Sequence, residues 1–180
     1  MKRTTLLAIG ATLLFATAGA ASAQVTGQID ATITLESGCI INGVNNNADA
    51  SNVDFGTVDF GLETTLFTQA DAAVADTGQG ITIQCTAGSA PVLTFGAGAN
   101  DGNGSGGGNK AMQHASDSTQ FVSYSLYSDA ARADLIDSGH QITLESDGTE
   151  QTVDVFGRAF GAPGLIEGTY SDTVLVTLEL

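Results

Sequence analysis

Basic residues are scarce in this chain. Its 180 residues include 5 Lys and Arg against 20 Asp and Glu, which sets the formal net charge at −15. A protein that binds nucleic acid uses Lys and Arg to contact the phosphates, so this deficit excludes a general nucleic-acid binder. The deficit also disfavours an anionic membrane surface as a partner.

Proline, tryptophan and charged residues in general are also few. The chain has Pro 2, Trp 0 and 14% charged residues, whereas Gly reaches 23 and hydrophobic residues make up 42%. This apolar fraction is too high for a disordered acidic tail. Thr and Ser are abundant and long Leu, Lys and Glu runs are absent, which favours an all-β extracellular domain.

The first residues have the features of an export signal. Two basic residues precede an apolar stretch at 6–15, and small residues follow, ending in Ala-Ser-Ala at 21–23. This order is typical of a secretory signal peptide, so we predict that residues 1–23 are removed and that about 157 residues remain, starting at Gln24. Two of the five basic residues lie in the signal, so the mature chain carries a charge of −17.

The chain has only two cysteines, Cys39 and Cys85. In an exported protein the oxidising compartment makes a disulfide the default for such a pair. The chain-entropy model gives about 4 kcal/mol for closing a loop of this length. The alternative is a metal or redox pair, but there is no C-x-x-C and only His114 and His140 could add ligands. We therefore predict a Cys39–Cys85 disulfide.

Apolar and polar residues alternate along the chain at the two-residue period of a β-strand. The runs are separated by turn residues, which predicts about eight short strands in one β-sandwich domain. They lie at residues 25–35, 55–60, 81–85, 91–95, 121–127, 141–144, 153–160 and 169–180. Only residues 130–136 could hold a helical turn, and residues 43–52 and 96–109 are predicted to be loops.

Residue types used in catalysis are present, but not in a recognised pattern. No G-x-S-x-G or H-E-x-x-H motif occurs, and His114 and His140 are predicted to be solvated. Residues 101–106 match the first half of an EF-hand loop, yet Met112 stands where a bidentate Glu is needed, so a solvated turn is predicted there. The sequence predicts neither an enzyme nor a cofactor.

The first alternating run lies outside the Cys39–Cys85 loop and has two possible partners. Such a strand can fold back into its own sandwich. Alternatively, it can be donated to another molecule by β-augmentation, in which main-chain hydrogen bonds supply affinity and alternate side chains fill pockets. The side chains on its apolar face are Val25, Gly27, Ile29, Ala31, Ile33 and Leu35.

Several short motifs follow one another along nearly the whole mature chain. They are VTGQ at 25–28, SGC at 37–39, FGTVDFG at 55–61, ITIQC at 81–85, VSYSLY at 122–127, DAAR at 129–132, FG at 156–157 and GTYSDTVLVT at 168–177. In this order they resemble the spore coat protein U domain family, the subunit fold of archaic (Csu-type) chaperone–usher pili.

The resemblance implies an incomplete immunoglobulin-like β-sandwich over residues 37–180 that lacks its final strand, with an N-terminal donor-strand extension over residues 24–36. In that family a periplasmic chaperone lends the missing strand, and the outer-membrane usher exchanges it for the extension of the next subunit. The extension corresponds to residues 25–35 here. The C-terminal strand would flank the open groove and be held by the chaperone through Tyr170, Val174, Val176, Leu178 and Leu180.

The function that the resemblance implies is structural. The chain would be a pilin subunit of a cell-surface fimbria, polymerised by donor-strand exchange with identical or related subunits and supporting adhesion and biofilm formation. One domain with an extension is typical of a rod or adaptor subunit. The alternative is a secreted coat protein of a spore or cell envelope with the same domain. Neither function implies an enzyme, a cofactor or a metal.

Overall fold

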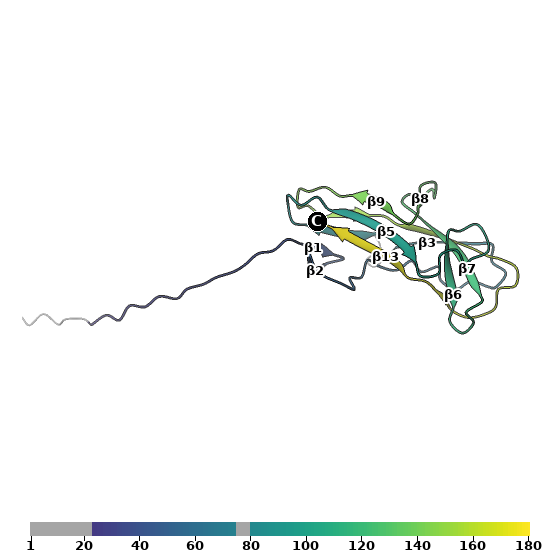
Figure 1. The fold of residues 1–180 in the computed structure, drawn as a ribbon, viewed down its shortest axis with the longest axis horizontal. Helices are drawn as coiled ribbons and strands as arrows, with labels where there is room; N and C mark the ends of the chain where they lie inside the picture. The colour runs from purple at the N-terminus through teal and green to yellow at the C-terminus, as the bar shows by residue number, and fades with distance from the viewer. Residues whose placement is uncertain (1–22, 75–79) are drawn as a thin grey trace, which may run out of the picture. The chain divides into compact units, whose positions relative to one another are not determined.

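The structure is a computed structural model that describes residues 23–74 and 80–180 (Figure 1). Residues 1–22 of the predicted signal peptide lie outside the described residues. The chain divides into two units, Met1–Thr34 and Leu35–Leu180. In the first unit, residues 23–34 form no strand, and Val25 and Ile29 are 99% and 98% exposed.

The second unit is all-β, which confirms the predicted fold class. Its strands are β1 (Gly38–Ile41), β2 (Val44–Asn47), β3 (Gln69–Ala73), β4 (Ile81–Cys85), β5 (Val92–Gly98), β6 (Lys110–His114), β7 (Phe121–Tyr127), β8 (Leu135–Ile136), β9 (His140–Thr143), β10 (Gln151–Val153), β11 (Phe156–Phe160), β12 (Tyr170–Ser171) and β13 (Val174–Glu179). Over residues 23–74 and 80–180 there is no helix of the length and hydropathy needed to span a membrane.

The strands form three antiparallel sheets. Their orders are β10-β4-β1-β2, β12-β6-β7-β11-β3 with β8 beside β7, and β13-β5-β9. Alternate side chains from all three sheets meet in one core, for example Ile83, Leu93 and Val122. This packing of sheet faces is consistent with the immunoglobulin-like β-sandwich that the sequence analysis predicts.

The predicted disulfide is confirmed. Cys39 on β1 and Cys85 on β4 lie opposite each other in the antiparallel ladder and are bonded. The chain then reverses from β1 to β2 through Asn42 and Gly43, whose φ angles are 48° and 78°. Two left-handed central residues are what a two-residue hairpin turn requires, and Asn-Gly supplies them at low cost.

Several predicted boundaries are correct and others are wrong. Strands β4 and β7 occupy the predicted ranges 81–85 and 121–127. By contrast, β2 lies inside the predicted loop at 43–52, because its residues complete a ladder with β1. Residues 55–60 are not a strand either, since their one ladder contact is an isolated bridge from Val58 to Val74.

The helical turn predicted at residues 130–136 does not form. One carboxylate oxygen of Asp129 accepts hydrogen bonds from the backbone N–H groups of Ala133 and Asp134, at 2.8 and 2.7 Å. Arg132 has a φ of 58°, in the left-handed region that interrupts a helix. The segment is therefore a closed turn that leads into β8.

The glycine-rich segment at 96–109 begins as the end of β5 and then turns back over β7. A Cβ atom on Gly108 would collide with the backbone of Tyr124, and one on Gly104 would collide with the Ser123 side chain. Glycine is needed at these positions because the backbone of the segment lies directly against the strand.

Candidate strand-acceptor groove

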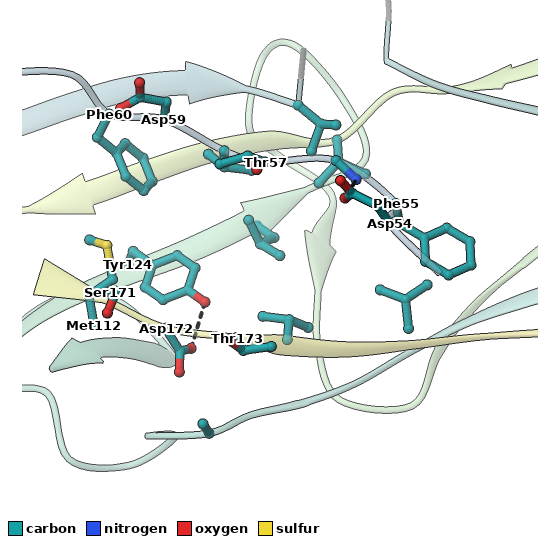
Figure 2. Close-up of a pocket in the computed structure, with 18 of the residues that line it drawn as sticks. Asp54, Phe55, Thr57, Asp59, Phe60, Met112, Tyr124, Ser171, Asp172 and Thr173 are labelled. Carbon is teal, nitrogen blue, oxygen red and sulfur yellow. Dashed lines mark hydrogen bonds between the residues drawn. The ribbon is translucent and has the colours of Figure 1, made fainter. Parts of the chain in front are cut away.

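A groove with a volume of about 1710 Å³ opens into the core of the second unit (Figure 2). Folded interiors hold few voids larger than a water molecule, so a space of this size is not a packing defect. The floor consists of apolar core side chains contributed by strands of all three sheets. They include Ile41, Ile81, Phe95, Val122 and Leu126, and Val155 between β10 and β11 also lines the groove.

Strand β13 forms one wall of the groove. It pairs with β5 through one edge and is the end strand of its sheet, so among the described residues its other edge has no ladder partner. Its alternate side chains, Val174, Val176 and Leu178, are half-buried, whereas the residues between them are exposed. An edge strand of this kind presents free N–H and C=O groups, which is a template for pairing with a further strand.

The irregular segment at residues 50–67 forms much of the opposite wall. Val58 and Phe60 are half-buried and pack against the core. The Phe60 ring meets the Tyr124 ring edge-on, with centroids 6.1 Å apart. The Val58 and Phe60 side chains lie over Gly157 of β11, where a Cβ atom would come within 2.6 Å of Val58 and 2.9 Å of Phe60. Glycine therefore allows this wall to approach the sheet.

A polar cluster closes the groove beside the start of β13. The Tyr124 hydroxyl donates a hydrogen bond to Asp172 at 2.7 Å, as Figure 2 shows. The other carboxylate oxygen of Asp172 accepts bonds from the backbone and side-chain nitrogens of Asn100, at 3.2 and 3.0 Å. Burial, together with the adjacent Asp172 carboxylate, raises the pKa of Tyr124 far above its usual range. The hydroxyl therefore remains a donor at any physiological pH.

The family model of the Spore Coat Protein U domain matches residues 25–177. The chain belongs to the Spore Coat Protein U domain family. The resemblance inferred from the sequence motifs is thereby confirmed.

Comparison with solved structures and with curated proteins gives further results. One similar structure is a chaperone–tip adhesion subunit pre-assembly complex from the archaic chaperone-usher Csu pili of Acinetobacter baumannii. The similarity has 23% identity and a TM-score of 0.44, and it covers 82% of this chain and 40% of that chain. This chain thus spans less than half the length of that one. No curated protein matches the sequence.

The C-terminal strand of this Spore Coat Protein U domain differs in one respect from the prediction. Residues 169–180 were predicted as one strand, but the chain divides at Asp172 into β12, which pairs with β6, and β13, which pairs with β5. At this break the Asp172 carboxylate accepts hydrogen bonds from Tyr124 and Asn100 instead of lying in either ladder. The five side chains predicted to flank the groove all line it: Tyr170, Val174, Val176, Leu178 and Leu180.

The apolar side chains of the N-terminal segment are exposed. Ile33 and Leu35 are each 83% exposed, and residues 23–37 form no strand. The sequence of this segment alternates with the two-residue period of a strand, but the strand predicted at residues 25–35 does not form in the structure. The donor-strand role of residues 25–35 stays a prediction.

The two histidines differ from the predicted solvated side chains. His114 is buried, and its Nδ1 accepts hydrogen bonds from the backbone N–H groups of Ser116 and Asp117 at 3.1 and 3.0 Å. Its Nε2 therefore carries the proton and donates to the Glu167 carbonyl at 3.1 Å. The prediction of a solvated His114 is wrong, because the buried imidazole bonds the turn at residues 116–117 to Glu167, which precedes β12. His140, in β9, is half-buried.

The groove offers hydrogen bonding and apolar burial rather than an arrangement of reactive groups. Within residues 23–74 and 80–180, no group of three or more His, Cys, Asp or Glu side chains is placed to hold a metal ion.

Sequence reasoning missed the Tyr124–Asp172 hydrogen bond, because nothing in the sequence around either residue indicates a pair that is 48 positions apart.

Proposed function

We propose that this protein is a structural subunit of a chaperone–usher pilus and that the groove accepts a strand from another polypeptide. The observation that carries the proposal is the apolar groove beside the free edge of β13. A strand placed there would extend the β13-β5-β9 sheet by one ladder and cover side chains that are now only half-buried. This is recognition by β-augmentation.

The donor in this proposal is the segment at residues 25–35 of a neighbouring subunit. Val25, Ile29, Ile33 and Leu35 alternate with polar residues and are 83–99% exposed. Burying four such aliphatic side chains contributes about 6–12 kcal/mol before entropy is subtracted. Ladder hydrogen bonds add a net of about 1 kcal/mol each at best. Gly27 and Ala31 would occupy the shallow positions of the groove.

The partners follow from the same mechanism. A periplasmic chaperone would hold the groove before assembly, and an outer-membrane usher would exchange the chaperone's strand for that of the next subunit. Family membership and the similarity to a structure from Csu pili support this assignment. The expected location is an extracellular fimbria, reached through the periplasm by means of the predicted signal peptide. Adhesion and biofilm formation would be properties of the fibre, and no enzymatic step is required.

A coat protein of a spore or cell envelope is the second candidate, and the family's name favours it. Both candidates use the same domain, so the groove does not separate them. Chaperone and usher genes beside this gene would favour the pilus. Electron microscopy of cells with and without the protein separates the two directly, because loss of thin fibres is expected for a pilus and loss of an envelope layer for a coat.

Charging one position of the donor segment tests strand donation. In the full-length exported chain, Ile29→Asp would place an unpaired carboxylate in the groove of the neighbour and should abolish polymerisation. Thr32→Asp lies on the opposite face of the strand and is the matched control, which should polymerise like the wild type. The measurement is fibre yield by sedimentation and microscopy, and equal yields from the two variants would contradict donation.

Deleting residues 24–35 separates donation from self-complementation. The shortened subunit should still bind a chaperone or a peptide of residues 24–35, but it should not extend a fibre. If the domain remains unfolded even with the peptide supplied in excess, the segment belongs to its own sandwich and the donor role is wrong.

A further inference from the structure

We propose that Asn103 is an acceptor for N-linked glycosylation of the exported protein. Asn103-Gly104-Ser105 matches the N-x-Ser/Thr acceptor motif, and no other Asn of the chain has Ser or Thr two residues later. The motif can be glycosylated only on the exposed surface of an exported protein, so the exposure of Asn103 decides whether a transferase can use it. This inference depends on export and not on the role of the groove.

The acceptor residues lie on an exposed turn. Asn103 and Ser105 are both exposed. The backbone N–H of Asn103 donates to the Asn100 carbonyl at 3.2 Å and closes the turn through Gly102, whose φ is 80°. The side-chain nitrogen of Asn103, which is the atom that would be glycosylated, donates to the same carbonyl at 3.1 Å. One local hydrogen bond is therefore all that must be broken to release it.

The base of this turn is held firmly while its tip projects. Asn100 is bonded to Asp172 through both of its nitrogens. The neighbouring Asp101 lies 3.6 Å from the ammonium group of Lys110, which is only 1% exposed and also donates to the Gly96 carbonyl at 3.3 Å. These two anchors keep the acceptor at a constant place on the folded domain, where a transferase can reach it.

A glycan on Asn103 would be compatible with the groove. Of the turn and the residues leading to it, Ala99 lines the groove, but Asn103 and Ser105 do not. A bulky and hydrophilic group attached at this position would cover the surface of the glycine-rich segment, leaving the β13 wall free.

The co-reactant is an oligosaccharide linked to a lipid through a diphosphate. The Asn103 side-chain nitrogen attacks C1 of the first sugar, so that an N–C1 bond forms and the bond from C1 to the phosphate oxygen breaks. The lipid diphosphate leaves with the electron pair, and a base of the transferase takes the proton from the nitrogen. The Ser105 hydroxyl is the group that the transferase recognises two residues after the acceptor.

The test is peptide mass spectrometry of the protein exported by its own host. We expect a glycan mass on the peptide that contains Asn103, and its complete loss in Asn103→Gln and in Ser105→Ala. Ser105→Thr preserves the motif and should keep the glycan. Asn45→Gln, on the exposed Asn45 outside any such motif, should also keep it. The three positions that these four variants change are exposed, so thermal unfolding should be unchanged apart from the glycan's own effect.

Three results would overturn the inference. The first is an unmodified Asn103 in the protein from its own host. The second is a glycan that persists in Ser105→Ala, because a transferase that reads the motif needs the hydroxyl. The third is a sugar attached to the Ser105 oxygen, which is a different modification.

Discussion

Strands β4 and β13 have similar sequence patterns but are buried to different degrees. Ile-Thr-Ile-Gln-Cys in β4 alternates apolar and polar residues throughout, and Val-Leu-Val-Thr-Leu-Glu in β13 does so except at Leu175, whose side chain is 66% exposed. In β4 the apolar positions are fully buried, with Ile83 at 0% exposure, whereas in β13 Val174, Val176 and Leu178 are only half-buried. Strand β4 has a ladder partner on each side, β1 and β10, whereas within residues 23–74 and 80–180 β13 pairs with β5 alone.

The difference teaches that an alternating pattern specifies a face to be buried and not the partner that buries it. Beneath β4 the chain supplies its own cover and adds a disulfide to β1. Val174, Val176 and Leu178 of β13 pack against the core on one side, but among the described residues they are only partly covered, and the groove lies beside them. Perturbations of the two strands should therefore have unequal effects, and a donor strand should reduce the inequality.

The largest effect is expected on the closed side, from loss of the disulfide. Replacing Cys39 and Cys85 together by Ala should lower the free energy of unfolding by about 4 kcal/mol, because the unfolded chain is no longer cross-linked. Denaturant titration of wild type and variant measures the loss. Thiol labelling of the denatured, unreduced wild type provides the control. Two free thiols per chain would show that the bridge is absent.

The second effect compares one side chain from each strand. Ile83→Ala should cost about 2–5 kcal/mol, because it leaves a cavity in a fully packed region. Val176→Ala in the isolated subunit should cost less than about 1 kcal/mol, since its side chain is already partly in contact with water. Denaturant unfolding of both variants measures this, and equal costs would mean that the groove is closed in solution.

The third effect appears when a donor is added. A peptide of residues 24–35 at 100 times its dissociation constant should stabilise the domain that lacks these residues by about 2.7 kcal/mol. Val176→Ala should then weaken peptide binding by about tenfold, because two buried methyl groups are worth about 1.4 kcal/mol or slightly more. Calorimetric titration measures the affinity, and an unchanged affinity would mean that β13 does not contact the peptide.

The smallest effect should come from an ion pair that belongs to neither strand. Arg158 donates two hydrogen bonds to Asp71, at 2.7 and 2.8 Å, and Arg132 lies 3.3 Å from the same carboxylate. The Arg158 hydrogen bond lowers the pKa of Asp71 below its usual value. The stabilisation is therefore complete above the pKa of the unfolded chain and is lost as pH falls through the lower folded pKa.

Comparison of the wild type with Asp71→Asn isolates this contribution. The wild type should be slightly more stable near neutral pH, because the pair is half-exposed and well screened. The difference in unfolding free energy should shrink to zero in acid. A difference that grows on acidification would mean that the pair destabilises the fold.

The elements that sequence reasoning located are those whose own side chains specify them. Strands β4 and β7 combine alternation with β-branched and aromatic residues, and one face of each strand is buried and apolar apart from the Tyr124 hydroxyl, while the other face of β7 buries Ser123 and Ser125. The disulfide followed from the count of cysteines and the expected compartment. The family resemblance placed the C-terminal strand, residues 170–180, beside the groove, and Val174, Val176 and Leu178 of β13 line the groove.

The elements that were missed are specified by their neighbours. Strand β3, Gln-Ala-Asp-Ala-Ala, has no strong strand former and exists because β11 offers a complete ladder. Strand β6 begins with Lys110. Lysine is usually exposed at the surface, yet here its ammonium group is buried beside Asp101. Neither arrangement is visible until residues distant in sequence are brought together, so local propensity could not predict them.

The division of the C-terminal segment at Asp172 bears on the register of β13, and so on which of its side chains face the groove. A slip of β13 by one residue would turn Val174, Val176 and Leu178 outward and carry Asp172 away from the Tyr124 hydroxyl. Burial and the adjacent Asp172 carboxylate raise the pKa of Tyr124, so its hydroxyl keeps the proton that it donates to Asp172 at physiological pH. The register of this wall is therefore set within the domain itself, and the proposed donor strand would have to match that register to bury all of its apolar side chains at once.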